Sequence, residues 1–355
     1  MKISLKNAIV ISLIPQIIIV KWLGTRSDLV EKYYSNGLYP IISKFFRLLL
    51  GWIPFSIGDI IYFVLIVLAL LYLIKNRKYI WRNKLKFLQN VAMVLSVAYF
   101  TFHVMWGLNY YREPLAKKLE LTPNKDYQDL LKFTERLIQK TNETQVTITN
   151  DSSLAVKIPY SQKEIFNKTI QGYDHLKTIH PFLAYDRPSI KKSLFSTGLT
   201  YMGYAGYLNP FTNEAQVNDL LPNFRFPFVA GHEVGHQLGY SAENETNFIG
   251  YLVTSNNEDD YFKYAAYAYG LGYCLNDIRR SDKKDFDRLM LQLNAGVKSN
   301  FQEMAIFWNS YENPMEPVFK SVFDTFLKAN NQKEGIKSYS AVVLFLVAYH
   351  KDHQL

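Results

Sequence analysis

Long apolar runs are confined to the first third of the chain, whereas the remainder mixes short apolar and polar stretches. Three runs have the length and composition of membrane-spanning helices, so we expect spans at about residues 8–23, 55–74 and 87–106. In a fourth stretch, residues 38–52, apolar side chains recur at helical spacing with basic residues between them. That pattern predicts an amphipathic helix lying along the membrane surface.

Basic residues around these runs predict an orientation. The stretch KNRKYIWRNKLK, residues 75–86, carries six basic and no acidic side chains, and Lys2 and Lys6 precede the first run. Cytoplasmic loops carry such an excess of Lys and Arg. We therefore expect an integral membrane protein, with its membrane region within residues 1–107, whose C-terminal domain is extracytoplasmic.

Beyond the spans, residues 108–125 read as a polar linker and residues 126–355 as one soluble domain. Helical periodicity marks residues 130–141, 162–180, 261–273, 284–294, 317–330 and 338–350. Residues 146–149 alternate as a strand does, and residues 196–218, rich in Gly, Tyr and Asn, predict short strands joined by turns rather than helix. The predicted fold class is mainly α, with a small β element.

Composition narrows the function. The net charge is +9, but no basic cluster with interleaved aromatic residues stands out in the last two thirds, so we expect no nucleic-acid partner. The single cysteine, Cys274, excludes an internal disulfide and a cysteine-based zinc site. A metal would have to be held by His, Asp or Glu side chains.

The sequence FPFVAGHEVGHQLGY contains the pattern His-Glu-x-x-His at His232, Glu233 and His236. Two histidines four residues apart lie on one face of a helix and can bind one Zn²⁺ ion, with the intervening glutamate as general base. Pro227 suits the first turn of such a helix and Gly239 suits a left-handed cap at its end. This site places the domain among zincin-like, mostly helical catalytic domains.

A catalytic zinc ion needs a third protein ligand. Ala242 occupies the position of the third histidine of metzincins and Asn256 that of the thermolysin glutamate, so neither pattern applies. We expect Glu243 to be the ligand, with Glu245 as the alternative and Glu258 as a third candidate.

The context of Glu243 supports this preference. Ser241 can cap a second helix that begins beside Glu243, and Asn247 lies one turn further on the same face. We expect Asn247 to orient Glu243 by hydrogen bonding, whereas Glu245 points nearly the opposite way.

The expected chemistry is zinc-assisted hydrolysis of peptide bonds, with Glu233 carrying the proton to the leaving amine. The strand-like residues 207–218 could bind an extended peptide, with side-chain hydrogen bonds from Asn213 and Asn218. Tyr251 and Tyr339 are guesses for an additional donor to the substrate. The expected partners are a peptide or protein substrate and membrane lipid.

Two alternatives stay open. The first is a zinc amidohydrolase that acts on cell-envelope material, such as a cell-wall crosslink. The second is a non-catalytic membrane scaffold or regulator with a structural zinc site.

The three spans, GLNYYREPL, NPFTNEAQVN, HEVGHQLGYSAENETNFIGYL and FLKANNQKEGIKSYSAVV together resemble the bacterial membrane-protein family called domain of unknown function 3810. The similarity covers almost the whole chain, and the block from HEVGH to ENETNF is its most specific part. The resemblance implies a zinc metallopeptidase class without a substrate. Because the family is bacterial, it also implies a location in the bacterial inner membrane, with the C-terminal domain in the periplasm. The spacing of Glu243 and Asn247 is also similar to the Glu-x-x-x-Asp or Asn element that supplies the third ligand in other membrane-linked peptidases.

Overall fold

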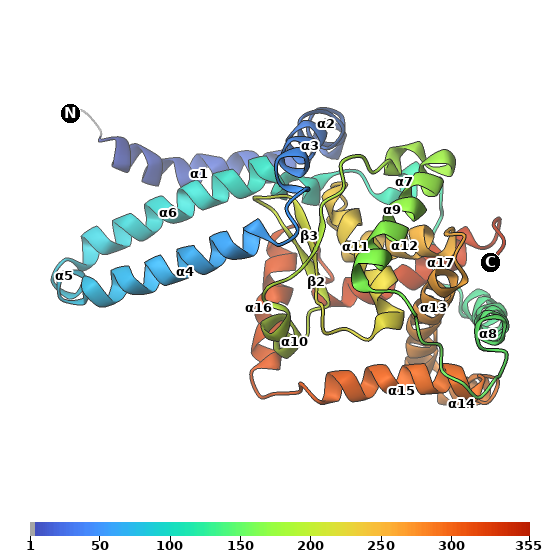
Figure 1. Cartoon of the computed structure of the whole chain (residues 1–355). Helices are drawn as coiled ribbons and strands as arrows, with labels where there is room; N and C mark the ends of the chain where they lie inside the picture. The colour runs from blue at the N-terminus through green and yellow to red at the C-terminus, as the bar shows by residue number, and fades with distance from the viewer. Residues whose placement is uncertain (1–3) are drawn as a thin grey trace.

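The computed structural model describes residues 4–355, apart from the side chains of residues 338–340. Three long helices project from one side of a helical body, which contains one small sheet (Figure 1). The predicted class, mainly α with a small β element ahead of the His-Glu-x-x-His helix, is confirmed.

The three projecting helices are long and apolar enough to cross a membrane. They are α1 (Leu5–Leu23), α4 (Ile57–Lys75) and α6 (Lys84–Met105), which match the three predicted spans within a few residues. The short helix α5 (Arg77–Arg82) joins α4 to α6 at the end remote from the body (Figure 1). The basic stretch 75–86 therefore lies at the far end of the spans.

Between α1 and α4 the chain forms α2 (Ser27–Leu29), the π-helix η1 (Val30–Leu38) and α3 (Tyr39–Leu50). Helix α3 is amphipathic as predicted, but its polar side faces the protein. It buries Ser43 and Arg47 and exposes large apolar side chains, namely Ile41, Phe45, Leu48 and Leu49. An exposed apolar stripe on a helix beside the span ends suits the membrane surface.

The segment after α6 packs tightly although its sequence reads as a linker. It contains the 3₁₀-helix η2 (Gly107–Tyr111) and α7 (Leu115–Lys118). Leu115 is fully buried, and the Arg112 guanidinium pairs with the Glu31 carboxylate at 3.0 Å in a buried position. Residues 107–119 thus connect the membrane helices to the body through a continuous packed interface.

Two local predictions for the body are wrong, and one of its helices was not predicted. Residues 146–149 end the long helix α8 (Tyr127–Thr149), and residues 196–202 form a helix rather than a strand. A further helix, α15, covers residues 295–309, for which no element was predicted. The other elements of the body are α9 (Gln162–Ile179), η3 (Pro181–Leu183), α10 (Ser196–Met202), η4 (Asn223–Arg225), α11 (Phe226–Gln237), α12 (Glu243–Ser255), α13 (Asp260–Ser281), α14 (Lys283–Leu291), α15 (Ala295–Asn309), α16 (Glu316–Ala329), η5 (Gly335–Ala341) and α17 (Val342–Tyr349).

The sheet has the strand order β1-β3-β2. Strand β1 (Ile190–Lys192) pairs in parallel with β3 (Glu214–Val217), and β2 (Gly206–Asn209) pairs antiparallel with it. Strand β2 is therefore an edge strand with one side of its backbone unpaired in the sheet.

Helix α11 runs through the centre of the body, and every one of its residues is buried. The sheet packs on one side of it and α12 on another, with α9 and α13 adjacent (Figure 1). The core thus holds rigidly the element that carries the His-Glu-x-x-His motif.

Candidate metal centre

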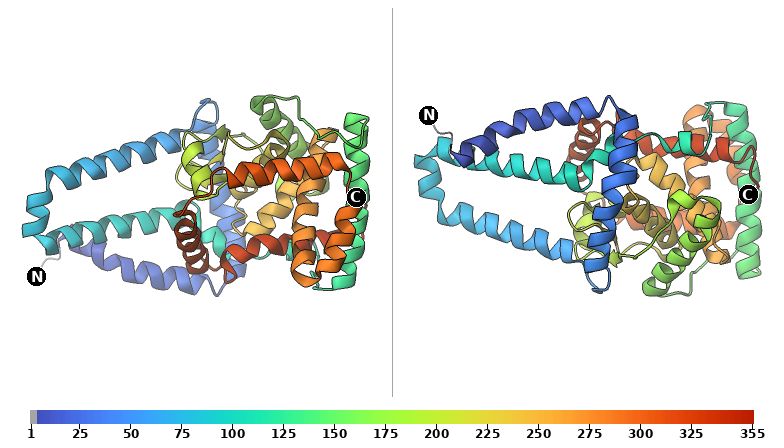
Figure 2. Two further views of the ribbon diagram at one scale, coloured as in Figure 1. Left: turned by 90° about the horizontal axis from the view of Figure 1, so that it is seen from below. Right: turned by 90° about the horizontal axis from the view of Figure 1, so that it is seen from above.

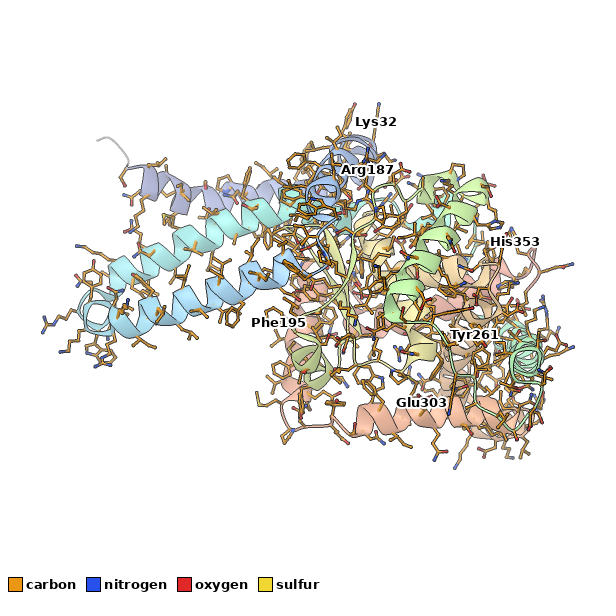
Figure 3. All side chains as sticks on the ribbon, viewed as in Figure 1. Lys32, Arg187, Phe195, Tyr261, Glu303 and His353 are labelled. Carbon is orange, nitrogen blue, oxygen red and sulfur yellow. The ribbon has the colours of Figure 1, made fainter. Side chains whose placement is uncertain are left out.

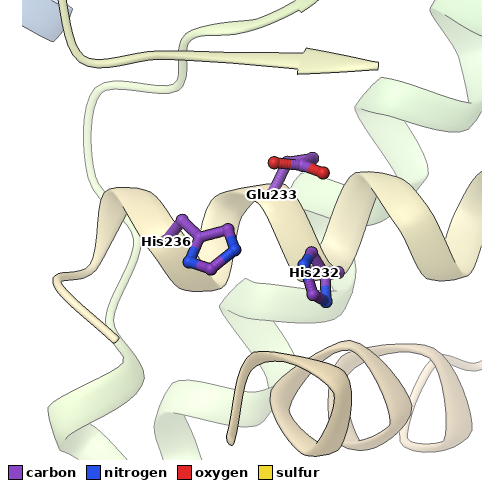
Figure 4. Close-up of side chains that lie close together, drawn as sticks. All are labelled: His232, Glu233 and His236. Atoms are coloured by element: carbon purple, nitrogen blue, oxygen red, sulfur yellow. The ribbon is translucent and has the colours of Figure 1, made fainter. Parts of the chain in front are cut away.

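Helix α11 brings the two histidines of the motif together. His232 and His236 lie one turn apart with ring centroids separated by 4.7 Å, whereas Glu233 points toward the strand beside the helix (Figure 4). Pro227 occupies the first turn, where its missing N–H costs no hydrogen bond. Gly239 follows the helix at φ = 85°, as the sequence predicts.

Helix α12 places Glu243 against the histidine pair. The Glu243 Oε2 atom lies 3.3 Å from His232 Nε2 and 3.6 Å from His236 Nε2. Glu243 is the first residue of α12, but Ser241 does not cap this helix, because its hydroxyl donates instead to the carbonyl of Asn109. The carboxylate of Glu243, the expected third ligand, therefore lies beside both imidazoles, while the expected cap by Ser241 is not formed.

Glycine residues explain why α12 can approach α11 so closely. A Cβ atom at Gly231 would lie 2.4 Å from Val253 Cγ1, and one at Gly250 would lie 3.1 Å from the Phe228 carbonyl oxygen. Larger side chains would push the two helices apart. The close approach lets a side chain as short as glutamate reach across to both imidazoles.

The site holds buried polar atoms without partners. They are His232 Nδ1, Glu233 Oε2, Glu243 Oε2 and Asn247 Nδ2, and none of them has a hydrogen-bond partner among the residues that the structure describes. Buried polar atoms are almost always paired, so this group of atoms has the chemistry of a cation-binding site. Two imidazoles and a carboxylate form a donor set suited to Zn²⁺, which leaves a fourth position open.

His236 is oriented for this role. Its Nδ1 atom lies 2.7 Å from the carbonyl oxygen of Tyr240, so a proton on Nδ1 leaves the Nε2 lone pair free to face Glu243. The carboxylate of Glu233 also lies within 4.8 Å of the ligand atoms of both histidines. Because Glu233 directly follows His232 on the helix, it projects about 100° away from that face and suits a base better than a ligand.

Burial and mutual charge perturb the pKa values of these groups in the metal-free protein. Burial, together with the nearby charge of Glu243, raises the pKa of Glu233 to about 8 against the opposing effect of His236. Burial is also the largest effect on His232, and it lowers the pKa of that ring. Burial would also lower the pKa of His236, but the charge of Glu243 outweighs it and raises the value to about 9. Conversely, His236 and His232 hold the pKa of Glu243 well below its usual range. Glu243 thus carries a negative charge that a bound cation could neutralise.

The alternative ligands lie elsewhere. Glu245 faces away from the histidines, and its Oε1 atom accepts a hydrogen bond from the backbone N–H of Leu115 at 2.7 Å. Burial raises the pKa of Glu245 to about 7. Glu258 is exposed beyond the end of α12. The predicted hydrogen bond between Asn247 and Glu243 is not formed; Asn247 lies beside His232, where it offsets a small part of the lowering of the His232 pKa by burial.

The structure does not bring the three predicted substrate-binding residues to this site. The Asn213 amide accepts from Ser43 and donates to Tyr39, and Asn218 donates to Thr200 and to the Tyr204 carbonyl. The Tyr251 hydroxyl bonds His350 at 2.8 Å. All three side chains are buried and already hydrogen-bonded, so they hold the fold together. The side chain of Tyr339 lies outside the described residues.

A cavity of about 870 Å³ opens onto the histidine pair. Glu233, Glu243 and Asn247 line it, and so does strand β2 through Gly206, Tyr207 and Leu208. Its other walls are mostly apolar and come from Tyr62, Ile66, Phe102, Trp106, Leu199, Phe228, Phe323 and Phe326, among others. The candidate metal centre is therefore reached through an apolar chamber.

Several residues at the site were missed by the sequence argument. The Trp106 indole N–H donates to the His236 carbonyl at 3.1 Å, and the Tyr39 hydroxyl donates to that of Gln237 at 2.8 Å. Arg112 donates to the Gly239 carbonyl at 2.9 Å. These contacts join segments more than one hundred residues apart in the sequence. The hydrophobic and polar pattern of either segment alone therefore could not predict them. They satisfy the carbonyls that the end of α11 leaves open.

Comparison with known families supplies an identification. The profile of a family described as a protein of unknown function, DUF3810, matches residues 34–347. The chain belongs to the DUF3810 family. The match includes α11 and α12, so the candidate metal centre lies within the DUF3810 region. Neither the curated proteins nor the solved structures contain a match to this chain.

Proposed function

We propose that this chain is a membrane-anchored, zinc-dependent peptidase. The observation that carries the proposal is the convergence of His232, His236 and Glu243, with unpartnered polar atoms, on one point of a buried cavity. A second carboxylate, Glu233, lies beside that point. These residues would hold Zn²⁺, and the metal would act as a Lewis acid toward the scissile carbonyl and the attacking water.

The remaining roles fall to residues of this chain. Glu233 takes the proton from the attacking water and transfers it to the leaving amine. Strand β2 is an edge strand of the sheet, and its Gly206 lies beside Glu233, so an extended substrate that pairs with this edge would run close to Glu233. A β-strand edge beside the candidate metal site favours a polypeptide substrate over a small molecule, because a polypeptide can pair with the strand. The same arrangement supports a zincin-like domain.

The proposal includes a location for the domain. Six basic side chains in residues 75–86 lie at the end of the spans remote from the body. By the positive-inside rule we infer that this end faces the cytoplasm and that the zinc site lies on the extracytoplasmic side of the bacterial inner membrane.

Metal analysis of the purified full-length protein tests the zinc site. We expect about one zinc per chain in the wild type and in the exposed-histidine control His175→Ala, and a large loss in His236→Ala. Absence of zinc from the wild type overturns the proposal. The full chain is required because residues of the membrane region, such as Trp106 and Tyr39, hold the end of α11.

The Glu233→Gln variant tests catalysis separately. We expect it to retain zinc, because Glu233 is not a proposed ligand, and to lose hydrolysis. The measurement compares the N-termini of membrane and envelope proteins in cells that produce the wild type or the variant. Identical N-termini in the two strains, with zinc bound in both proteins, would assign the metal a structural role in a scaffold or regulator. Changes limited to non-protein envelope material would favour the amidohydrolase.

A further inference from the structure

The cavity at the candidate metal centre extends into the membrane region. Its walls include Tyr62 and Ile66 in the second and third turns of α4, and Phe102 in the last turn of α6. Phe326 of α16 lies against Phe102, with ring centroids 6.1 Å apart. One continuous apolar space therefore connects the space between α4 and α6 to the histidine pair.

Helix α4 stands apart from the other spans. Four consecutive residues of it, Phe63 to Ile66, are 59%, 46%, 55% and 56% exposed. Because successive residues point about 100° apart around a helix, no side of α4 is covered by protein at this level. Figure 2 shows α4 diverging from α1 and α6, and Figure 3 shows its side chains projecting into open space.

Helices α1 and α6 contrast with α4 because polar contacts join them. The Gln16 amide donates to the Ser96 hydroxyl at 3.1 Å, and that hydroxyl donates to the Ile9 carbonyl at 2.7 Å. Such hydrogen bonds stabilise helix pairs in a bilayer. The open side of the membrane region is therefore the one between α4 and the α1–α6 pair.

The first turn of α4 is fixed to the sheet, which keeps this side open. The Glu214 carboxylate accepts the N–H groups of Ile57 at 3.1 Å and Gly58 at 2.6 Å. The Asp59 carboxylate accepts the N–H of Leu194 at 2.6 Å and also the hydroxyl of Tyr207 on β2. Strand β2 is thus tied directly to the base of α4.

The candidate metal centre lies at the depth where the spans end. Trp106 follows the last residue of α6, and its indole contacts the backbone of His236. Helices α3 and α16 cross the span ends on opposite sides of the opening (Figure 2). Like α3, α16 exposes an apolar stripe, made up of Val318, Val322 and Phe326, and Met315 directly before the helix is exposed as well. Trp22 and Trp52, which are also exposed near these ends, suit the membrane–water interface.

We infer that the substrates are membrane-embedded proteins. A transmembrane helix of the substrate docks between α4 and α6, and the extended segment of the substrate next to that helix pairs with β2 beside Glu233. This inference rests on the proposed peptidase function and adds the substrate class to it. The unpaired edge of β2 selects a polypeptide, since the acyl chain of a lipid has no groups that match backbone N–H and C=O. The cavity walls are apolar from α4 to Phe228, so the substrate segment would stay out of water between the membrane and the histidine pair.

Site-specific photocrosslinking tests the docking step without requiring catalysis. A photoreactive benzoylphenylalanine replaces Ile66, which lines the cavity, or Leu68, which lies about 200° further around α4 and does not line it. Both side chains are apolar and 56% exposed. The full-length protein with Glu233→Gln is reconstituted in phosphatidylethanolamine–phosphatidylglycerol vesicles. The probe is a helix of about 20 leucine and alanine residues with a polar tail.

We expect crosslinks to the probe to be several-fold more frequent from position 66 than from position 68. Equal yields at the two positions, or crosslinks from position 66 to lipid alone, would overturn the docking site. A crosslink from position 66 to a second copy of this chain would overturn it as well, because the opening would then be an oligomer interface. The zinc content of the same preparation is measured independently. Absence of zinc overturns the peptidase proposal, whereas an unfavourable crosslinking pattern with zinc still bound overturns only the docking site.

Discussion

At the scale of single residues, the identity of the third zinc ligand decides the chemistry of the site. We expect Glu243→Gln to weaken zinc binding by more than the roughly 10–100-fold that is typical of losing an outer hydrogen-bond partner. The reason is that Glu243 Oε2 lies 3.3 Å and 3.6 Å from the two imidazole Nε2 atoms. Competition with a chromogenic chelator measures the affinity.

Glu245→Gln is the matched control for this prediction. Glu245 lies two residues away, and a glutamine there can still accept the hydrogen bond from Leu115. We expect it to bind zinc as the wild type does. The reverse pattern, with zinc lost from Glu245→Gln and kept in Glu243→Gln, would move the ligand to the other carboxylate.

The preference for Glu243 was available from the sequence because it depends on helical geometry over a short distance. Asn213 shows the limit of that reasoning. Its place just before a strand is consistent with substrate binding, but its amide is occupied by Ser43 and Tyr39, which lie about 170 residues earlier in the chain. Only the tertiary fold reveals which buried amides are already paired.

Gly206 is a second residue whose role follows from its surroundings. A Cβ atom there would lie 2.6 Å from Glu233 Oε1 and from the Gln216 carbonyl oxygen. We expect Gly206→Ala to displace Glu233 and to reduce hydrolysis strongly, while zinc stays bound because neither histidine is disturbed. Kinetic assay and zinc analysis of one preparation check the two effects.

Gly198 provides the control, because it lines the same cavity but has open space around its Cβ position. Gly198→Ala should leave hydrolysis close to the wild-type rate. If Gly206→Ala were equally active, Glu233 would have room to move and the packing argument would fail.

At the scale of elements, long apolar runs located the three spans well, whereas helical periodicity covered only part of α8 and missed α15. The three spans were predictable because a bilayer demands a long apolar run. Residues 146–149 alternate like a strand, yet they continue α8, whose preceding turns bury Leu137, Thr141 and Gln145 on one face. Extending an existing helix by four residues is favourable, because the costly first turn has already formed. Alternation over only four residues is too short to predict a strand in that position.

The joint between α12 and the end of α17 predicts a pH dependence of stability. Burial lowers the pKa of His350 from 6.5 to about 4. The neutral ring accepts a hydrogen bond from Tyr251 at 2.8 Å, and its other nitrogen bonds the His353 carbonyl at 3.0 Å. In the unfolded chain the same ring gains a proton near pH 6.5, so protonation favours unfolding.

We therefore expect the free energy of unfolding to fall as the pH drops from about 6.5 to about 4, by roughly 3 kcal/mol from this group, and to change little through His350 above that range. His350→Gln should remove this part of the acid sensitivity, whatever its stability at neutral pH. His353→Gln, an exposed neighbour, is the control. Unfolding of the detergent-solubilised chain at several pH values measures the effect, and parallel pH curves for wild type and His350→Gln would contradict it.

At the scale of the whole molecule, the membrane region and the body form one unit around the candidate site. Backbone carbonyls at the end of α11 accept hydrogen bonds from Tyr39, Trp106 and Arg112, which lie within or just after the membrane region. The sequence suggested an anchor followed by an independent domain, because linkers and packed connectors share polar and proline residues. The packing instead makes the anchor part of the scaffold of the site.

The orientation of this unit in the membrane is open to a direct labelling test. Ser299→Cys places a thiol on the exposed side of α15, and Lys78→Cys places one on α5 at the remote end of the spans. The single native cysteine, Cys274, is fully buried and does not compete for the reagent. A membrane-impermeant maleimide therefore reports on one engineered position at a time in intact spheroplasts.

We expect Ser299→Cys to react in intact spheroplasts and Lys78→Cys to react only after the membrane is permeabilised. The physical reason is that six basic side chains in residues 75–86 oppose transfer of that loop across the membrane, whereas a long domain is translocated largely regardless of its charge. The opposite labelling pattern would place the zinc site in the cytoplasm. It would leave the docking of a transmembrane substrate untouched, because the opening between α4 and α6 depends only on how the spans meet the body.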